Sequence, residues 1–335
     1  MKILFPYSTN KMNGPEKWRQ DLVNELSKDN DVLNVATNKI SFIFNIFKVH
    51  KVDVLHIYNQ SITNFGLIFL AKIFRKKIVY TLHGDYYSEY FNKKGVKKIL
   101  WMPVNNLLVK LVNVITFPSN YLQNLILSKQ PELSKKCMVI PNGLDFSKIE
   151  KKEKYSKEKI GLNNNDFLIV EITNFNYIKK AEGIVLLIKA FKKVLAKNKN
   201  SRLFIIGGGR YLDLFKNKYE SPEIKFLGFR NDAISYLKCA DLFIHISFLD
   251  NFPYVVLESV TCGIPTIIND FGGMKEIVKN VEATTKNDHK DLHKKIEKIQ
   301  KDEVFKKQLI KTEMNYIENF SIEKIASMFV KNVYV

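Results

Sequence analysis

Cysteine is scarce in this chain, acidic residues are outnumbered, and long apolar runs are missing. The three cysteines, Cys137, Cys239 and Cys262, lie far apart without metal-ligand spacing, which predicts a reducing, cytoplasmic environment. No apolar run approaches the roughly 18–20 residues of a membrane span. The strand-like start at 1–6 lacks the apolar core of a signal peptide. We therefore expect a chain that is neither secreted nor membrane-spanning.

The shortage of acid leaves a formal net charge of +19. Residues 1–150 hold 21 Lys and Arg against 11 Asp and Glu, and two basic clusters precede the apolar-rich segment 99–112. The clusters comprise Lys72, Arg75, Lys76, Lys77, Lys93, Lys94, Lys97 and Lys98. Such a combination suits an anionic membrane surface, but lysines also simply solvate a surface, and both interpretations stay open. No nucleic-acid module is recognisable, so no nucleic-acid partner is expected.

Strand-like and helical segments alternate along the chain, which predicts α/β architecture with parallel sheets. The expected strands of the first half are 2–7, 32–37, 53–58, 77–82, 113–118 and 137–141, and the expected helices are 15–28, 62–75, 96–112 and 120–129. The pattern breaks at 141–143, and the charged segment 148–159 follows. This break indicates the boundary between two domains.

The alternation then restarts. The expected strands are 167–173, 202–206, 224–228, 241–246 and 265–269, and the expected helices are 183–198, 210–219, 231–239, 253–262 and 272–279. Charged helical sequence fills 289–317, and a last amphipathic helix covers 321 to about 333. Two doubly wound halves of this kind bind ligands at the carboxyl ends of their strands.

One segment, SFLDNFPYVVLESVTCGIP at 247–265, combines two carboxylates with a helix start. Asp250 precedes Pro253, which suits the first helical turn because that position needs no N–H. Glu258 lies in the second turn. The N-terminus of this helix would bind an anion, and the carboxylates could accept sugar hydroxyls. The alternative is a capped helix with a solvent-facing Glu.

This segment resembles the signature of retaining, nucleotide-sugar-dependent glycosyltransferases of family 4, which have the GT-B fold. The matching residues are Phe252, Leu257, Glu258, Cys262, Gly263 and Pro265. Asp250 stands where the first Glu usually is, and Asn251 and Pro253 replace glycines, a variant that the family also contains. The resemblance implies a Rossmann-like acceptor-side domain at 1–147 and a nucleotide-sugar-binding domain at 148–319, facing a central cleft. The C-terminal helix, 320–335, is expected to cross back to the first domain.

Three further motifs extend the resemblance. The turn 141–145, Pro-Asn-Gly-Leu-Asp, matches the interdomain turn of the family. Gly208 lies in a Gly-Gly-Gly turn after a strand, where a structural turn and a ligand contact both stay open; the dinucleotide fingerprint is not present. His83 follows a strand at its carboxyl end. A lone His is more often structural, but the resemblance implies a place near the donor sugar.

The basic pair of the family is altered. An Arg after the first strand of the second domain and a later Lys usually neutralise the donor diphosphate. Here Asn174 stands near the Arg position and cannot supply its charge. Lys180 is the expected Lys, with Lys179 as the alternative because the spacing to Gly183 is altered.

The resemblance implies retaining transfer of a sugar from a nucleotide diphosphate to an acceptor hydroxyl, in polysaccharide or glycolipid synthesis. No cofactor or metal is implied, and 29–31, Asp-Asn-Asp, is interpreted as a turn. A sugar or lipid-linked acceptor and peripheral contact with the inner membrane face are expected. The expected catalytic residues are His83, Asp250 and Lys180, and the expected donor-binding residues are Gly14, Asn174, Lys179, Gly208, Asn251, Phe252, Pro253, Tyr254 and Glu258.

Two alternatives stay open. One is a GT-B enzyme of another reaction, such as a sugar-nucleotide epimerase or a phosphorylase, because a fold does not determine a reaction. The other is a non-catalytic GT-B binding subunit, which the missing Arg near Asn174 favours.

Overall fold

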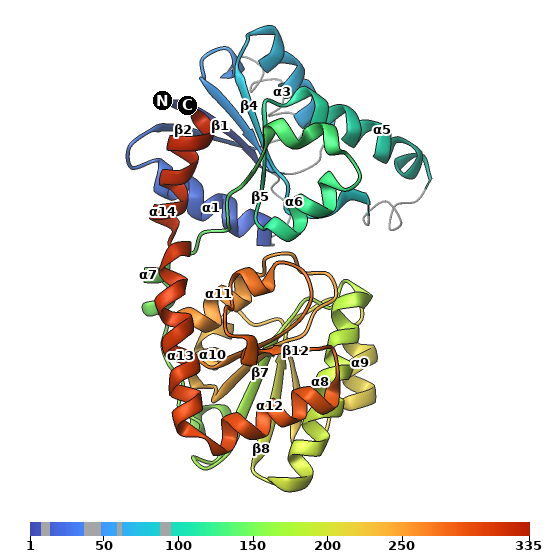
Figure 1. Ribbon diagram of the computed structural model, residues 1–335, viewed down its shortest axis with the longest axis vertical. Coiled ribbons are helices and arrows are strands. Elements are labelled where there is room, and N and C mark those ends of the chain that lie inside the picture. Colours follow the sequence, from blue (N-terminus) through green and yellow to red (C-terminus); the bar gives the residue numbers. More distant parts are fainter. Residues whose placement is uncertain (8–13, 37–47, 59–61, 88–94) are drawn as a thin grey trace. The chain divides into compact units, whose positions relative to one another are not determined.

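The computed structural model describes residues 1–7, 14–36, 48–58, 62–87 and 95–335. They form two compact units, which are described separately (Figure 1). The first unit consists of Met1–Asp145 with Phe320–Val335, and the second is Phe146–Asn319. Each contains a six-stranded parallel sheet with helices packed around it.

The sheet of the first unit has the order β2-β1-β3-β4-β5-β6. Its strands are β1 (Lys2–Tyr7), β2 (Asp31–Ala36), β3 (Val54–Ile57), β4 (Lys77–Thr81), β5 (Val114–Phe117) and β6 (Cys137–Val139), and its main helices are α1 (Gly14–Leu26), α3 (Ile62–Ile73), α5 (Val96–Leu111) and α6 (Asn120–Leu127). All four residues of β3 are buried. Central strands of a parallel sheet are covered on both faces, which explains their nearly continuous apolar sequence.

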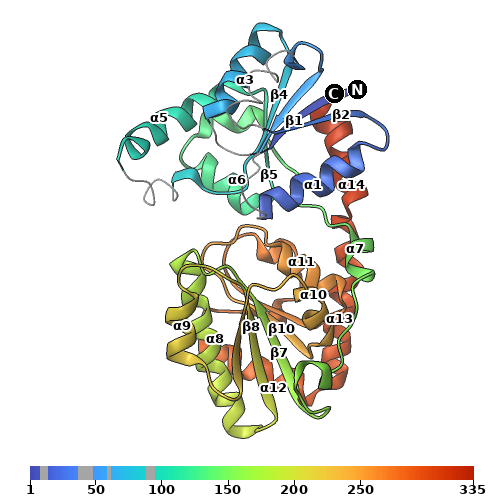
Figure 2. The ribbon, with the colours of Figure 1, turned by 180° about the vertical axis from the view of Figure 1, so that it is seen from behind.

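The sheet of the second unit has the order β12-β11-β10-β7-β8-β9, and Figure 2 shows β10, β7 and β8 side by side. Its strands are β7 (Phe167–Ile172), β8 (Ser201–Ile206), β9 (Ile224–Gly228), β10 (Leu242–His245), β11 (Thr266–Asn269) and β12 (Thr284–Thr285). Its helices are α7 (Phe146–Glu150), α8 (Ile178–Lys197), α9 (Leu212–Tyr219), α10 (Ala233–Cys239), α11 (Tyr254–Thr261), α12 (His289–Lys301) and α13 (Glu303–Ile317). In the sheet, β8 lies on one side of β7 and β10 lies on the other side. The order of the strands therefore reverses between β7 and β10.

The C-terminal segment belongs to the first unit. Helix α14 (Ile322–Met328) packs against α1, and a π-helical turn (Phe329–Tyr334) follows it (Figure 1). Leu144 holds its start, because its N–H donates to the Phe320 carbonyl (2.9 Å) and its own carbonyl accepts from the Ile322 N–H (3.1 Å). At the other end, the Tyr334 hydroxyl lies 2.6 Å from Nδ1 of the buried His56. The expected return of the last helix to the first domain is confirmed.

Two expected helices differ in the structure. The helix predicted over 272–279 is wrong, since a single 3₁₀ turn forms there (Met274–Glu276). The backbone before this turn is not helical, because Gly272 has φ 64° and the Gly273 N–H donates to the Asn251 carbonyl (2.8 Å). Helix α8 begins at Ile178 rather than at 183. Among the residues described, no helix combines the length and apolar character needed to cross a membrane.

Candidate functional site

The reversal of strand order between β7 and β10 marks a candidate ligand-binding edge of the second sheet. Open doubly wound sheets bind ligands where neighbouring strands lead to opposite sides, just beyond the carboxyl ends of the strands. Glu171 is the penultimate residue of β7, and His245 is the last residue of β10. Both residues are buried, with 0% and 1% of their whole surface exposed. The sequence therefore places two ionisable groups at the edge where the sheet opens.

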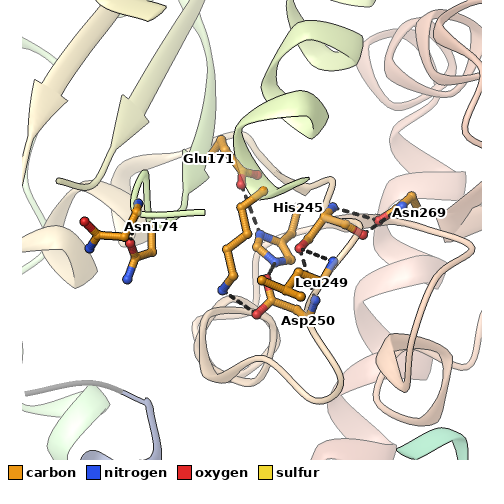
Figure 3. A network of polar contacts seen from close by, with 9 residues as sticks. Glu171, Asn174, His245, Leu249, Asp250 and Asn269 are labelled. Atoms are coloured by element: carbon orange, nitrogen blue, oxygen red, sulfur yellow. Dashed lines mark hydrogen bonds and ion pairs between the residues drawn. The ribbon is translucent and has the colours of Figure 1, made fainter. Parts of the chain in front are cut away.

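Four ionisable side chains form a continuous network there (Figure 3). Lys180 Nζ lies 2.5 Å from Asp250 Oδ1, His245 Nε2 lies 3.1 Å from Asp250 Oδ2, and His245 Nδ1 lies 3.0 Å from Glu171 Oε1. We call Glu171, His245, Asp250 and Lys180 the charge network. Its members come from β7, β10, the loop after β10 and the first turn of α8. Acidic and basic groups alternate along it, so every contact joins opposite charges when all four are ionised.

The surroundings set the charge of each group. Burial raises the pKa of Glu171 to about 7, although His245 opposes this effect. Burial alone would lower the pKa of His245, but Glu171 and Asp250 outweigh it and raise that pKa to about 9. Burial also opposes ionisation of Asp250, yet Lys180 and His245 hold its pKa well below the usual range. At neutral pH, Asp250 is therefore an anion between two cationic groups.

The loop that carries Asp250 is fixed from two sides. Its N–H donates to Ser247 Oγ (3.2 Å), and the Ser247 N–H donates to Asn269 Oδ1 (2.9 Å). Asn269 Nδ2 returns a hydrogen bond to the Ser247 carbonyl (3.0 Å) and donates another to Asn287 Oδ1 (2.8 Å). A Cβ at Gly272 would lie 2.1 Å from the Asp250 carbonyl oxygen. These contacts hold the loop at one position relative to β10 and β11.

Gly183 lets α8 reach this loop. A Cβ at Gly183 would lie 1.9 Å from the Ile246 carbonyl oxygen and 2.7 Å from its carbon. Any side chain there would collide with backbone, so the helix would have to move away from the end of β10. Lys180 stands one turn earlier on the same helix. The close approach at Gly183 therefore positions the Lys180 ammonium against Asp250.

Asn174 and Gly208 take part in a loop-to-loop contact. Asn174 is exposed, and its Oδ1 accepts a hydrogen bond from the Asn176 N–H (2.8 Å). The Gly208 carbonyl accepts from the Phe175 N–H (3.0 Å). Next to it, Gly207 has φ 142°, and a Cβ there would lie 1.7 Å from the Thr173 carbonyl oxygen. The glycine turn after β8 is thus packed directly onto the loop after β7, which is a structural role.

Helix α11 begins beside Asp250, one residue later than expected. Pro253 is its N-cap, with φ −75° and ψ 132°, so the expected place of Pro253 inside the first turn is wrong. No side chain caps this end, and the first N–H groups of a helix have no partner within it. Glu258 lies in the second turn and is 6% exposed. The neighbouring side chains of Phe252 and Tyr254 are buried as well, whereas Asn251 is half-buried.

The other expected site residues do not join the charge network. Lys179 is exposed on α8. His83 and Gly14 belong to the first unit, where Gly14 is the first residue of α1 and His83 follows β4. The His83 ring packs edge-on against Trp18, with 4.7 Å between ring centroids. Burial lowers the pKa of His83 to about 3, so its imidazole is neutral at physiological pH.

Sequence reasoning missed Glu171 and His245, and it used Gly183 only as a spacing marker. A signal was present for the first two, since an acid interrupts the apolar run of β7 (FLIVEI) and a histidine ends that of β10 (LFIH). Charged groups are seldom buried unless they are paired, so two such residues in neighbouring strands indicate a pair. Within the described part of the chain, no cluster of three or more His, Cys, Asp or Glu could hold a metal ion.

Known proteins share both the sequence pattern and the fold. Residues 152–319 match the family of glycosyl transferases group 1, and residues 26–148 match Glycosyltransferase Family 4. The chain is 26% identical over 239 residues to N-acetyl-alpha-D-glucosaminyl L-malate synthase of Bacillus anthracis, covering 68% of this chain and 59% of that protein. It is 26% identical over 251 residues to UDP-Gal:alpha-D-GlcNAc-diphosphoundecaprenol alpha-1,3-galactosyltransferase of Escherichia coli, covering 71% and 63%.

The crystal structure of Anabaena HepE in complex with UDP-glucose has the same fold, with a TM-score of 0.79 over 99% of each chain at 18% identity. The chain spans about three fifths of the length of the two curated relatives. The expected GT-B fold, with two parallel α/β sheets and a C-terminal helix on the first unit, is confirmed, and the structure adds β12 as a sixth strand of the second sheet that was not expected. With its second unit matched almost from end to end, the chain belongs to the glycosyl transferases of group 1.

Proposed function

We propose that the protein is a retaining glycosyltransferase that moves a sugar from a nucleotide diphosphate to an acceptor hydroxyl in glycan or glycolipid synthesis. The observation that carries this proposal is the Lys180–Asp250 pair at the switch point of the second sheet, beside the uncapped start of α11. Membership of the family supports it. The E. coli relative is named as using UDP-Gal as its donor, and HepE was crystallised with UDP-glucose.

The donor would be bound by groups of opposite kinds. Lys180 and the N–H groups at the start of α11 suit the diphosphate, because cations and helix N-termini stabilise charge that grows on a leaving group. Asp250 accepts hydrogen bonds from donor sugar hydroxyls. Glu258, one turn into α11, accepts those of the nucleotide ribose. These roles use the carboxylates as acceptors, so they are not an acid–base pair of the glycosidase kind.

Lys180 and Asp250 would change partners when the donor binds. A diphosphate carries more negative charge than one carboxylate, so it attracts the Lys180 ammonium away from Asp250 Oδ1. That oxygen then accepts a sugar hydroxyl instead. One salt bridge thus supplies both a phosphate ligand and a sugar ligand.

His83 of the first unit is a neutral imidazole. Because its pKa is lowered to about 3, His83 can exchange hydrogen bonds with a sugar but carries no charge at neutral pH. The resemblance assigns His83 to the donor sugar and the backbone at Gly14 to the diphosphate. The resemblance implies transfer on one face of the sugar in which the departing phosphate takes the acceptor proton, so the proposal includes no separate base.

Metal independence is part of the proposal. Lys180 and the start of α11 provide positive charge for the diphosphate without a cation. Turnover measured with EDTA in place of Mg²⁺ should be unchanged, whereas a loss that Mg²⁺ or Mn²⁺ restores would refute metal independence while leaving sugar transfer intact.

Thermal shift with UDP-, GDP- and ADP-sugars tests donor binding and identifies the base. A ligand at 100 times its Kd stabilises the folded state by about 2.7 kcal/mol. We expect one nucleotide class to raise the melting temperature, and Glu258→Ala to lose that shift while melting normally by itself. Glu182→Ala, an exposed acid on α8, is the matched control and should keep the shift. No shift with any nucleotide sugar would favour the non-catalytic subunit.

Product analysis separates the remaining enzyme alternatives. An epimerase converts the nucleotide sugar with no acceptor, and a phosphorylase consumes inorganic phosphate. We expect release of nucleoside diphosphate that depends on a glycan or lipid-linked acceptor and is unaffected by phosphate.

The first unit also offers a membrane-facing surface, so we propose a cytoplasmic protein that contacts the inner face of the membrane. Helices α3 and α5 pack against each other, and each exposes large apolar side chains. Among the side chains that are described, the most exposed are Phe69 (64%), Ile73 (58%), Ile99 (73%) and Leu107 (50%). Lys72, Arg75 and Lys110 are exposed on or next to the same helices. Lys93 and Lys94 of the expected basic clusters lie outside the described residues, and the side chains of Lys97 and Lys98 are not described.

Exposed apolar groups with adjacent cations suit an anionic bilayer, where each Lys or Arg near the surface adds about 1 kcal/mol. The E. coli relative is named for a diphosphoundecaprenol-linked acceptor. Flotation with phosphatidylglycerol vesicles tests this contact. We expect binding to be weaker when the vesicles contain phosphatidylcholine alone. The Phe69→Ser, Leu107→Ser double variant should also bind more weakly, whereas Leu214→Ser, which alters a 60% exposed leucine of the second unit, should bind like the wild type. If the double variant bound the anionic vesicles as strongly as Leu214→Ser and the wild type, this surface would be removed from the proposal.

A further inference from the structure

We infer that Glu171 and His245 are positioning residues that keep Asp250 ionised and aimed at the donor sugar when Lys180 turns to the diphosphate. The inference rests on the proposed function, because it assigns Asp250 to the sugar and Lys180 to the phosphates. It adds a counter-charge behind Asp250 that does not depend on Lys180.

The hydrogen-bond geometry requires an extra proton on the pair. Both ring nitrogens of His245 face a carboxylate oxygen, Nδ1 that of Glu171 and Nε2 that of Asp250. A neutral imidazole has one N–H and one lone pair, so it can donate to only one of two ionised carboxylates. Either the imidazolium donates to both, or a protonated Glu171 donates to Nδ1. In both cases, the Nε2 proton lies on the side of Asp250.

The two cations on Asp250 differ in freedom. Lys180 reaches Oδ1 on a long side chain that is 18% exposed, whereas the His245 side chain is 2% exposed. The ring of His245 is also stacked on Phe243, with an angle of 5° between the ring planes and 6.2 Å between centroids. Lys180 can therefore swing to a new anion by rotating its own bonds. His245 cannot follow, so Asp250 Oδ2 keeps its contact.

Glu171 interacts with His245 alone among the hydrogen-bonding groups of the described residues. Its Oε1 contacts Nδ1, and its buried Oε2 has no hydrogen-bond partner in that part of the chain. Two apolar side chains of similar volume would fill such positions at lower energetic cost than a buried ion pair. The stability of the sheet thus gives no reason for an acid and a histidine here, and their effect on Asp250 does.

Few ionisable groups face His245. Glu171 comes from β7 and Asp250 from the loop after β10. Lys180 acts from α8 through its contact with Asp250. From β11, the residue paired with His245 is Ile268, which has no charge. Burial and the two carboxylates have opposite effects on the pKa of His245, and the net value is about 9. The pKa of Glu171 is about 7, so ionisation of the pair is most complete near pH 8, and His245 loses its proton as pH rises through about 9.

The test compares the affinities for the nucleotide sugar and for the nucleoside diphosphate alone, measured by calorimetry from pH 7.5 to pH 10. This range lies above the second pKa of a terminal phosphate, about 6, so titration of the ligand does not change the ratio. Only the nucleotide sugar uses Asp250, so the ratio of the two affinities reports on Asp250. For the wild type, we expect the ratio to be steady at neutral pH and to fall above about pH 9, where His245 loses its proton.

Two variants separate positioning from mere structure. Glu171→Gln removes the nearer carboxylate charge from His245, so the fall in the ratio should begin about one pH unit lower or more. His245→Gln retains an N–H donor but no titrating group, so the ratio should be about tenfold lower and should not vary with pH in this range. Affinity for the nucleoside diphosphate should stay within about twofold in both variants. Glu182→Gln, exposed on α8, should match the wild type throughout.

The outcomes are distinguishable. If the wild type binds nucleotide sugars but Glu171→Gln has the wild-type pH profile, the inference is wrong and the proposed function stands. Equal loss of both affinities would likewise make the pair purely structural. If the wild type binds neither ligand, the proposed function fails, and the inference fails with it. Should Glu171→Gln not fold, the pH-independence of His245→Gln decides alone.

Discussion

Lys180 Nζ lies 2.5 Å from Asp250 Oδ1, although seventy positions separate the two residues in the sequence. Their side chains are 18% and 15% exposed, so water screens the pair only in part. Each residue is the nearest opposite charge of the other. The proposed site therefore depends on this tertiary contact, in which Lys180 exchanges Asp250 for the diphosphate when the donor binds.

Removal of Lys180 should affect catalysis more than folding. We expect Lys180→Ala to lower kcat by roughly a hundredfold, because one preorganised positive group is lost from the leaving diphosphate. Lys179→Ala should cause a much smaller loss, since Lys179 lies outside the charge network. Steady-state kinetics with the donor identified by thermal shift measure both. A larger loss in Lys179→Ala would reverse the choice between the two lysines.

Gly183→Ala should separate α8 from the end of β10. The added Cβ would overlap the Ile246 carbonyl, and such overpacking destabilises a protein by about 1–3 kcal/mol. Because α8 also carries Lys180, donor turnover should fall beyond what the lost stability explains. Urea unfolding and kinetics on the same samples test this, with the exposed Lys189→Ala on α8 as the control. Unchanged stability and turnover would mean that the helix tolerates a side chain here.

A buried acid on α13 should weaken the second unit at neutral pH. Glu313 is 1% exposed, and neither carboxyl oxygen has a hydrogen-bond partner within the described residues. Burial raises its pKa well above the ordinary value of 4.5. The folded state thus binds this proton more tightly than the unfolded state, so its contribution to stability is complete below pH 4.5 and is lost as pH rises through the folded pKa.

Glu313→Leu should therefore stabilise the protein at pH 8 by about 1–3 kcal/mol, and the gain should shrink toward pH 4.5. Leu309 and Ile317, one turn away on either side, are buried apolar residues that a leucine would extend. Denaturant unfolding at both pH values checks the difference. A gain that is equal at both values would show that ionisation of Glu313 is not its source.

His83 should remain neutral far below the usual range of histidine. Its pKa is lowered from 6.5 to about 3 by burial, so protonation in the folded state requires much stronger acid than in the unfolded state. Stability linked to this group is complete above pH 6.5 and is lost as pH falls toward 3. In ring-proton NMR spectra, the His83 signal, assigned by its loss in His83→Asn, should stay constant from pH 7.5 to 5. Titration near pH 6.5 would contradict its burial against Trp18.

Much of the fold could be predicted because strands such as β7 and β10 are short apolar runs that parallel sheets require. The expected helix at 272–279 failed for a tertiary reason. Its first residues, Gly272 and Gly273, pack on the backbone of Asp250 and Asn251, a contact that local periodicity does not encode.

The site was predictable in part. The motif around Asp250 and Glu258 predicted a loop followed by a helix, which the structure contains, but the partner of Asp250 depended on how close α8 approaches β10. Gly183 determines that distance, and its significance is visible only when Ile246 lies against it. Glu171 and His245 could have been found as ionisable residues within apolar strands, since burial makes an unpaired charge too costly.

Retaining transfer is most directly tested by following the donor with ¹H NMR while water or a simple glycoside accepts the sugar. We predict that the first product carries the anomeric configuration of the donor, that nucleoside diphosphate appears with it, and that Asp250→Asn suppresses both by at least about tenfold while still binding the nucleoside diphosphate. A product of inverted configuration, or Asp250→Asn turnover equal to that of the wild type, would contradict the proposed use of this site.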